Sequence, residues 1–349
     1  MAQTLRLPAR VEDLTAAWLS EVLGREVAEV AVPEVVLGTA TKVRLELTYA
    51  DDAAVAPPRE LCAKGGLDER LAGWGLGPAY VLEARFFADV APHLGTGVPR
   101  CWFAGVDDGA GTGLVLLDDL AASGCAFGDP TCPWSADLVA AALELLAGWH
   151  ARTGAPGAPR PAWLTAGAAA VRGTARTFLT REHWEPHFAQ EGAPVLPARL
   201  QDPERLLRAF EHLWALDDAA AHCVVHGDAH VGNTFVTADG RPGFLDWQTA
   251  CLGPWSADVA YFVGGALTVE DRRVHERDLL HGYLEALSAH GGPQVSRDEA
   301  WADYVRHALH GVLWAATPAV MQPLERIVAM AQRYAAAIED LEVLDALSA

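Results

Sequence analysis

The first third of the chain carries two hydrophobic patterns. Apolar residues fall on alternate positions in several short runs bounded by turn-forming residues, as in β-strands. These runs predict strands at 35–36, 43–49, 60–64, 99–104 and 114–117. Two other runs repeat their apolar residues with the spacing of one helix face, which predicts amphipathic helices at 11–23 and 80–91. We therefore expect residues 1–117 to form a small β-rich lobe.

Beyond residue 117 helical patterns dominate. The segment 118–133 is rich in Ala, Gly and Pro, and we place the domain boundary at its start. Ser135 can cap the helix that follows, and other helical segments are predicted at 165–190, at 203–220 and from 257 to the end. One β-hairpin, with strands at 234–236 and 243–245, interrupts them. The predicted fold class is α+β, with residues 118–349 as a larger, mainly helical lobe.

Composition and charge narrow the class of protein. The formal charge of the chain is -20, which argues against binding to nucleic acid or to anionic lipid. This acidity suits a cationic substrate, but it equally serves solubility. No apolar run reaches the roughly 18 residues of a membrane-spanning helix. The six cysteines form no CxxC pair, which is typical of reduced thiols in a cytoplasmic protein.

Lysine is scarce in this chain. Only Lys42 and Lys64 are lysines, whereas the other 24 of the 26 basic residues are arginines. Arginine cannot replace lysine where a compact ammonium group must reach one phosphate oxygen in a tight site. Lys64 ends a predicted strand, so it is a candidate phosphate ligand. Lys42 is a second candidate, although it could have remained by chance.

The most informative stretch is His226-Gly-Asp228-Ala-His230-Val-Gly-Asn233, followed by Asp246-Trp247-Gln248. Asn233 lies five positions after Asp228, and Asp246 lies thirteen positions after Asn233. Because the predicted hairpin folds this segment back on itself, the three side chains can converge. Phosphoryl transfer from a nucleotide uses such a set, in which one Asp orients the attacking hydroxyl while an Asn and a second Asp hold Mg²⁺.

The remaining parts of such a site are a lysine and a glutamate. The lysine reaches the nucleotide phosphates from a strand of the other lobe, and a helical glutamate positions it. Lys64 fits the first role, and Glu83, on the next predicted helix, fits the second. The sequence therefore predicts Asp228, Lys64 and Glu83 as catalytic residues and Asn233 and Asp246 as metal ligands.

These motifs resemble the signature of the aminoglycoside phosphotransferase and choline kinase-like superfamily. His226 to Asn233 is similar to its HGDxHxxN motif, and Asp246-Trp247-Gln248 to its metal-binding motif. The segment 253–258 is similar to a later motif whose Asp, here Asp258, braces the catalytic loop. The N-terminal helix and the Asp-x-Gln form resemble the ecdysteroid-kinase-like branch and its bacterial relatives.

The resemblance implies a protein-kinase-like fold that binds ATP and Mg²⁺ between two lobes. The segment 118–120 is similar to the hinge between those lobes, and the phosphate loop keeps one glycine, Gly38. The residues expected to contact the nucleotide are therefore Gly38, Thr39, Lys42, Lys64, Leu116, Leu117 and Asp118. The implied activity is transfer of the γ-phosphate to a hydroxyl of an antibiotic, an amino alcohol, a sugar or another natural-product alcohol.

Several alternatives stay open at this level. His226 and His230 are four positions apart and could bind zinc, but the adjacent glycines favour a loop in which they act as hydrogen-bonding residues. A pseudokinase would bind ligands without turnover, and it would be expected to lack part of the residue set. A hydrolase could use Asp228 and Asp246 as an acid–base pair, but that leaves Asn233 unexplained. The acceptor, the choice of ATP or GTP, and monomer or homodimer also stay open.

Overall fold

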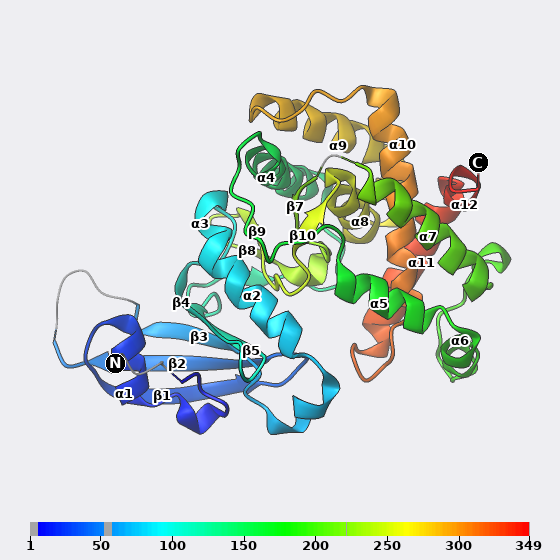
Figure 1. The fold of residues 1–349 in the computed structure, drawn as a ribbon. Helices are drawn as coiled ribbons and strands as arrows, with labels where there is room; N and C mark the ends of the chain where they lie inside the picture. Colours follow the sequence, from blue (N-terminus) through cyan, green and yellow to red (C-terminus); the bar gives the residue numbers. More distant parts are fainter. Residues whose placement is uncertain (1–5, 52–57, 221, 349) are drawn as a thin grey trace. The chain divides into compact units, whose positions relative to one another are not determined.

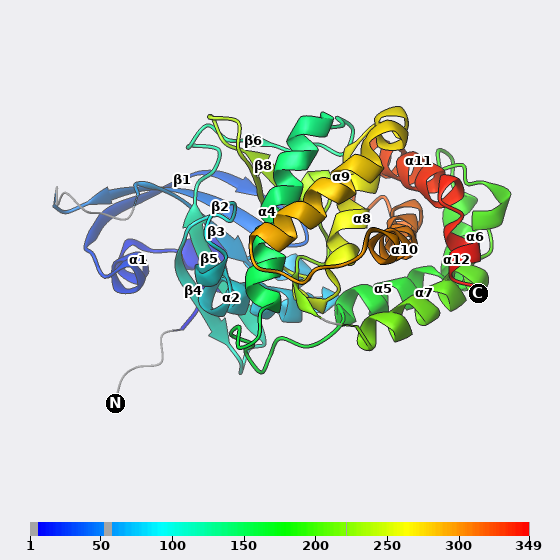
Figure 2. The ribbon, with the colours of Figure 1, turned by 90° about the horizontal axis from the view of Figure 1, so that it is seen from above.

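The computed structural model describes residues 6–51, 58–220 and 222–348 (Figure 1, Figure 2). The chain divides into two compact units. Unit 1 runs to Ala126 and also takes in two later segments, Thr237–Gly240 and Leu245–Gln248, and unit 2 contains the rest. A β-sheet dominates unit 1 and helices dominate unit 2, which confirms the predicted α+β class.

Unit 1 is built on a five-stranded sheet in the order β1-β2-β3-β5-β4, and neighbouring strands are antiparallel. Sequence periodicity predicts all of these strands. The first one starts eight residues earlier than predicted, because the exposed edge strand shows little alternation. The strands are β1 (Val27–Val36), β2 (Thr41–Tyr49), β3 (Glu60–Gly65), β4 (Cys101–Asp107) and β5 (Thr112–Asp118).

The two faces of this sheet differ in chemistry. One face carries the alternating apolar residues of β2, such as Val43 and Leu45, which are fully buried in the core of unit 1. The other face carries Lys42 and Lys64, which are directly opposite each other in the β2–β3 register. Alternation along these strands therefore separates an apolar core from a polar face.

Helix α2 (Gly77–Asp89) approaches the sheet closely at β5. A Cβ atom at Gly113 would lie only 2.3 Å from the backbone oxygen of Tyr80, so this position requires glycine. Unit 1 also contains α1 (Ala16–Leu23), α3 (Ala91–Leu94) and the 3₁₀ turns η1 (Val11–Asp13) and η2 (Glu69–Trp74). The helix predicted at 11–23 starts late, because Thr15 is extended and accepts the backbone N–H of Trp18 as an N-cap.

Unit 2 contains most of the helices. Ser135 caps α4 as predicted, whereas the C-terminal helices are interrupted around Pro318 and Pro323, where helix propagation is unfavourable. The helices are α4 (Ala136–Gly154), α5 (Ala169–Phe178), α6 (Arg181–Phe188), α7 (Pro203–Asp218), α8 (Trp255–Ala266), α9 (Val269–Ala289), α10 (Arg297–His307), α11 (Leu324–Asp340) and α12 (Val343–Ala346). The 3₁₀ segments are η3 (Ala198–Leu200), η4 (Val231–Asn233) and η5 (Ala308–Ala316).

Short strands in unit 2 frame the segment that carries the sequence motifs. The predicted hairpin is present, with β8 (Thr234–Val236) antiparallel to β9 (Pro242–Phe244) and β6 (Ala126–Phe127) beside β8. A second pair, β7 (Cys223–Val225) and β10 (Cys251–Gly253), was not predicted, because these short strands lie far apart in the sequence and no turn signal joins them. None of the helices in the described ranges is both long and apolar enough to cross a membrane.

Candidate functional site

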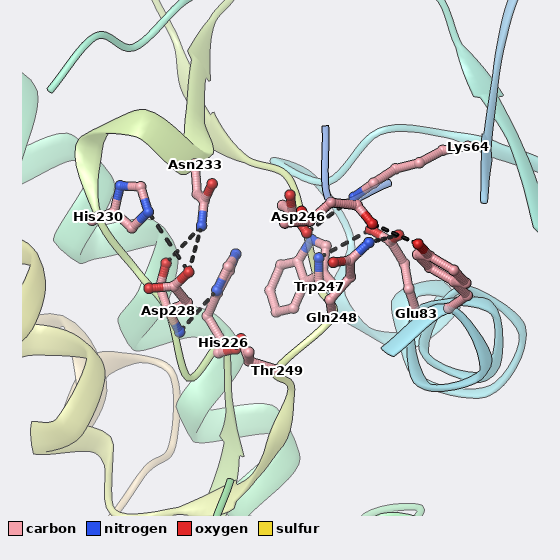
Figure 3. A network of polar contacts seen from close by, with 12 residues as sticks. Lys64, Glu83, His226, Asp228, His230, Asn233, Asp246, Trp247, Gln248 and Thr249 are labelled. Atoms are coloured by element: carbon pink, nitrogen blue, oxygen red, sulfur yellow. Dashed lines mark hydrogen bonds and ion pairs between the residues drawn. The ribbon is translucent and has the colours of Figure 1, made fainter. Parts of the chain in front are cut away.

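Three predicted site residues meet in unit 1 (Figure 3). The Lys64 Nζ atom lies 2.7 Å from Glu83 Oε1 and 3.0 Å from Asp246 Oδ1. The lysine and the glutamate are almost fully enclosed, with side chains 5% and 3% exposed. Burial disfavours the ammonium form, but Asp246 and then Glu83 raise the pKa of Lys64 above its ordinary value. Lys64 is therefore a fixed cation.

Glu83 also anchors the segment that presents Asp246. Its Oε1 atom accepts the backbone N–H of Trp247 at 3.1 Å, and its Oε2 atom accepts the side-chain amide of Gln248 at 3.3 Å. The Trp247 ring stacks on Phe86 of α2, with ring centroids 4.1 Å apart. Sequence analysis gave Glu83 only the role of positioning Lys64. The signal in the sequence for its second role, as an anchor of the segment after Asp246, was the side-chain amide of Gln248, which can donate to a carboxylate.

The backbone at Asp246 adopts a left-handed conformation, with φ at 67°. Few residues other than glycine accept this conformation, and the flanking contacts of Trp247 and Gln248 hold it in place. The Asp246 side chain remains 22% exposed. It therefore combines a fixed backbone with carboxylate oxygens that solvent can reach, as a metal ligand requires.

Lys42 occupies a different environment from Lys64. It is half-buried, and among the described residues no carboxylate forms an ion pair with it. Burial, and then the neighbouring charge of Lys64, lowers the pKa of Lys42 below its ordinary value. Lys42 thus carries a poorly compensated positive charge on the same face of the sheet as Lys64.

The loop between β1 and β2 contains Gly38 and Thr39. The Tyr80 hydroxyl donates a 2.6 Å hydrogen bond to the Thr39 carbonyl oxygen, which ties this loop to α2. Tyr80 is itself buried. The loop is therefore held next to the start of β2, where Lys42 lies.

The predicted base-binding residues lie at the end of β5. The side chains of Leu116 and Leu117 are buried, so a nucleotide base could meet this segment only through the backbone. Asp118 donates its backbone N–H to the Arg100 carbonyl oxygen and accepts the Trp102 indole N–H at 2.7 Å. Because β5 pairs with β3 on one side and with β4 on the other, the backbone of Leu116 and Leu117 is part of the sheet. Contact of a base with this segment stays a prediction.

Asp228 and Asn233 meet in unit 2 (Figure 3). The Asn233 side-chain amide donates to Asp228 Oδ2 at 3.1 Å and to the Asp228 backbone oxygen at 3.0 Å. Desolvation favours the neutral acid, but the adjacent His230, with His226 and His310, lowers the pKa of Asp228 below its ordinary value. The Asp228 side chain is 37% exposed. Asp228 is therefore a carboxylate with an accessible face.

The local backbone supports this loop. Gly227 has φ at +79°, and a Cβ atom there would lie 2.5 Å from the Thr249 backbone oxygen, so glycine is required. His226 Nδ1 accepts the backbone N–H of Asp228, and His230 Nδ1 accepts that of Gly232. Both histidines thus shape the loop. Within the described part of the chain, no three His, Cys, Asp or Glu side chains converge on a metal position.

The metal ligands predicted from sequence fit Mg²⁺ by their donor chemistry. Asn233 uses its NH₂ group on Asp228, which leaves its carbonyl oxygen for another ligand. Asp246 offers partly exposed carboxylate oxygens. Mg²⁺ prefers such oxygen donors and completes its shell with water and phosphate oxygens. Asn233 and Asp246 therefore remain the predicted ligands.

A pocket in unit 2 lies beside the loop of residues 226–233 at Gly227 and is also lined by Trp214 and Tyr261. All three carboxylates in its wall already have partners. Asp258 accepts the backbone N–H groups of His226 and Gly227 and lies 3.3 Å from His150 Nε2. Asp218 pairs with Arg172, with the closest atoms 2.7 Å apart, and Asp217 accepts a 3.0 Å hydrogen bond from His307. Burial opposes the charged imidazole, but Asp217 raises the pKa of His307 above its ordinary value. The pocket therefore offers no uncompensated carboxylate to a cationic acceptor.

Asp258, on α8, fixes the start of the loop of residues 226–233. Its Oδ2 atom accepts the backbone N–H of His226 at 2.7 Å, and its Oδ1 atom accepts that of Gly227 at 3.0 Å. His150 Nε2 lies 3.3 Å from Oδ2. Burial favours the neutral acid, but the His150 hydrogen bond and charge lower the pKa of Asp258 below its ordinary value. Asp258 supports the loop as an ionised residue.

Replacing Asp258 by Asn is expected to lower the free energy of unfolding by about 2–3 kcal/mol, because the amide can accept only one of the two buried backbone N–H groups. Urea denaturation of both forms measures this loss. Asp108→Asn is a matched control, because Asp108 is exposed and its loss is expected to stay within about 0.5 kcal/mol. A loss below about 1 kcal/mol at Asp258 would contradict the bracing role.

Comparisons with known proteins agree with this architecture. Residues 77–318 match the model of the phosphotransferase enzyme family. Because this match spans well over half of the chain, the chain belongs to that family. This confirms the resemblance to the aminoglycoside phosphotransferase and choline kinase-like superfamily. No curated protein sequence matches the chain significantly.

Solved structures are similar to this chain at low sequence identity. The choline kinase of Cryptosporidium parvum Iowa II is 10% identical, with a TM-score of 0.52 and 90% coverage of both chains. The choline kinase LicA of Streptococcus pneumoniae is 15% identical, with a TM-score of 0.49, and the alignment covers 95% of this chain and 98% of that one. The macrolide 2'-phosphotransferase MphH of Brachybacterium faecium is 19% identical, with a TM-score of 0.46 and coverage of 90% and 95%.

Proposed function

We propose that the protein transfers the γ-phosphate of ATP to a hydroxyl group of a small molecule. The observation that carries this proposal is the pair of clusters, in a phosphotransferase family member, that supply a phosphate-binding cation and a proton acceptor. One cluster is the buried Lys64–Glu83–Asp246 group, and the other is the ionised Asp228 with Asn233. A pseudokinase would be expected to lack part of the catalytic set. This chain keeps the whole set, which comprises Lys64, Asp228, Asn233 and Asp246.

Unit 1 would bind the nucleotide. Lys64, held by Glu83, would contact the phosphates, and Lys42 and the Gly38–Thr39 loop would contact them from the adjacent strand. Backbone groups at the end of β5, around Leu116 to Asp118, would bind the base. Asp246 and Asn233 would hold Mg²⁺. When bound, the metal ion would neutralise charge on the transferring phosphate and orient it.

Asp228 would act on the acceptor hydroxyl. The acceptor oxygen forms a bond to the γ-phosphorus, while the bond from that phosphorus to the β–γ bridging oxygen breaks and ADP leaves with the electron pair. The hydroxyl proton passes to an Asp228 carboxylate oxygen. Because the pKa of Asp228 is low, this carboxylate mainly orients the hydroxyl and accepts its proton late in the reaction.

A thermal-shift measurement with Mg-ATP tests nucleotide binding and separates this proposal from the hydrolase alternative. Specific binding at 100 times Kd is expected to add about 2.7 kcal/mol of apparent stability. Mg-GTP in a parallel series distinguishes the two nucleotides, and ATP with EDTA tests the metal. An unchanged melting temperature with both Mg-nucleotides would contradict the proposal.

The affinity for the nucleotide is expected to weaken as pH rises, because Lys42 loses its charge. This weakening is expected to begin at a pH below the ordinary pKa of lysine. The free enzyme has a lowered Lys42 pKa, so the phosphate-binding ammonium is fully present only below that value and is lost above it. Calorimetric titration of Mg-ATP across the alkaline range measures the effect. Lys42→Arg keeps the charge at high pH and is expected to remove this dependence. An identical alkaline loss in both proteins would exclude Lys42 as its source.

The pocket in unit 2 guides the choice of acceptors to test, and the cysteines bear on the cellular location of the protein. Because the pocket beside Gly227 has paired carboxylates, the acceptor panel must include neutral alcohols, such as sugars and macrolides, beside choline, ethanolamine and aminoglycosides.

All six cysteines are free thiols. Together with the use of ATP, this supports a cytoplasmic enzyme.

A further inference from the structure

The Tyr261 hydroxyl lies between Asp228 and Trp314 inside unit 2. It donates to Asp228 Oδ1 at 3.2 Å and accepts the Trp314 indole N–H at 2.7 Å. The rings of Tyr261 and Trp314 are buried, with 5% and 6% of their surface exposed. These contacts connect α8 and η5 to the catalytic loop.

The direction of this hydrogen-bond chain is fixed by its chemistry. An indole nitrogen can only donate, so the Tyr261 oxygen must accept from Trp314. The single hydroxyl proton of Tyr261 then remains for the Asp228 Oδ1 atom, which lies 3.2 Å away. Trp314 therefore directs the Tyr261 proton toward the carboxylate.

Each Asp228 oxygen thus has its own side-chain donor. Tyr261 holds Oδ1, and Asn233 holds Oδ2. Tyr261 is itself fixed, because its ring stacks on Tyr334 with centroids 5.2 Å apart and its backbone oxygen accepts the Tyr334 hydroxyl at 2.9 Å. Because a firmly held side chain donates a hydrogen bond to each oxygen of Asp228, the rotation of the Asp228 carboxylate is fixed.

We infer that Tyr261 is a positioning residue for phosphoryl transfer, which orients the Asp228 carboxylate toward the acceptor hydroxyl while Trp314 sets the direction of its hydrogen bond. This inference rests on the proposed function, because it gives Asp228 the acceptor-orienting role. Tyr261 does not contact the nucleotide or transfer a proton in this role. It acts through Asp228, so its effect depends on the carboxylate being there.

Tyr261→Phe tests the inference, because it removes the hydroxyl and keeps the ring. Turnover is measured as ADP release from Mg-ATP with water as the acceptor, so the natural alcohol need not be known. We expect kcat to fall by roughly 10-fold, the scale of losing a hydrogen bond to a charged group, with Mg-ATP affinity unchanged. Trp314→Phe is expected to give a smaller loss in the same direction.

Tyr304→Phe is the matched control. Tyr304 is also buried, and its hydroxyl also donates to a carboxylate, Glu276 Oε2, at 3.2 Å. This variant is expected to keep the wild-type kcat. A similar loss in the Tyr304 and Tyr261 variants would show that losing any buried tyrosine hydroxyl perturbs the enzyme, and it would overturn the positioning role.

A double-mutant cycle separates positioning from structural damage. In the Asp228→Asn background, Tyr261→Phe is expected to cost little further turnover, because the carboxylate it orients is already gone. A full 10-fold loss in that background, or no loss in the wild-type background, overturns the inference while leaving the proposed function intact. If the wild type releases no ADP with water or with any alcohol of the acceptor panel named above, the proposed function fails, and this inference fails with it.

Discussion

Replacing Asp228 by Asn is expected to lower turnover by roughly 100-fold or more, the scale of losing a general base and its orienting effect. The amide keeps the shape of the side chain and its contact with Tyr261, but it removes the charge and the proton acceptor. Affinity for Mg-ATP is expected to survive. Steady-state ADP release and calorimetric titration of the same protein give both quantities.

Asp246→Asn is the comparison that separates the roles of the two carboxylates. Asp246 has a fixed backbone and accessible oxygens, so its loss is expected to weaken Mg-nucleotide binding itself. If the Asp228 variant lost nucleotide binding and the Asp246 variant kept it, the base and the metal ligand would be exchanged. If both variants kept full turnover, phosphoryl transfer at this site would be excluded.

Lys64→Arg is expected to lower turnover by roughly 100-fold or more, as for other groups that stabilise charge on the transferring phosphate. The substitution keeps a positive charge, so the two carboxylates beside it are not left unpaired. The guanidinium is larger, however, and the Lys64 side chain is 5% exposed and enclosed by Glu83 and Asp246. Its terminal group cannot take the position of a compact ammonium.

The control for Lys64→Arg is a test that the variant still folds. Circular dichroism and the melting temperature are expected to show a folded protein, with a loss of about 1–3 kcal/mol from overpacking. Lys64→Met provides a contrast, because it leaves Glu83 buried without its cation, and it is expected to cost about 3–5 kcal/mol. Near-normal turnover of Lys64→Arg would remove Lys64 from the mechanism.

The elements that sequence periodicity predicted are those with a clear apolar pattern. The alternation in β2 and the cap at Ser135 were sufficient for β2 and α4. The first eight residues of β1 were missed, because an exposed edge strand has no buried face to mark it. The short strands β7 and β10 were missed because no turn signal joins them, as one joins β8 to β9, and they form only by long-range pairing.

The residues of the candidate site that belong to sequence motifs could be predicted from the spacing of those motifs. Lys64, Glu83 and Asp246 converge within unit 1, and Asp228 and Asn233 converge within unit 2. The second contact of Glu83, with the backbone beside Asp246, was missed because it joins residues 164 positions apart. Tyr261 was missed because its hydroxyl meets Asp228 across a helix packing contact that no local pattern encodes.

The most direct test of the central claim is detection of the phosphorylated product. Wild-type protein and Asp228→Asn are incubated with Mg-ATP and a panel of choline, ethanolamine, aminoglycosides, sugars and macrolides, and products are identified by phosphorus NMR and mass spectrometry. The proposed function predicts a phosphate monoester of one acceptor class with the wild type, formed in equal amount with ADP and nearly absent with the variant. No phosphorylated alcohol with any class, or equal product from both proteins, would contradict it.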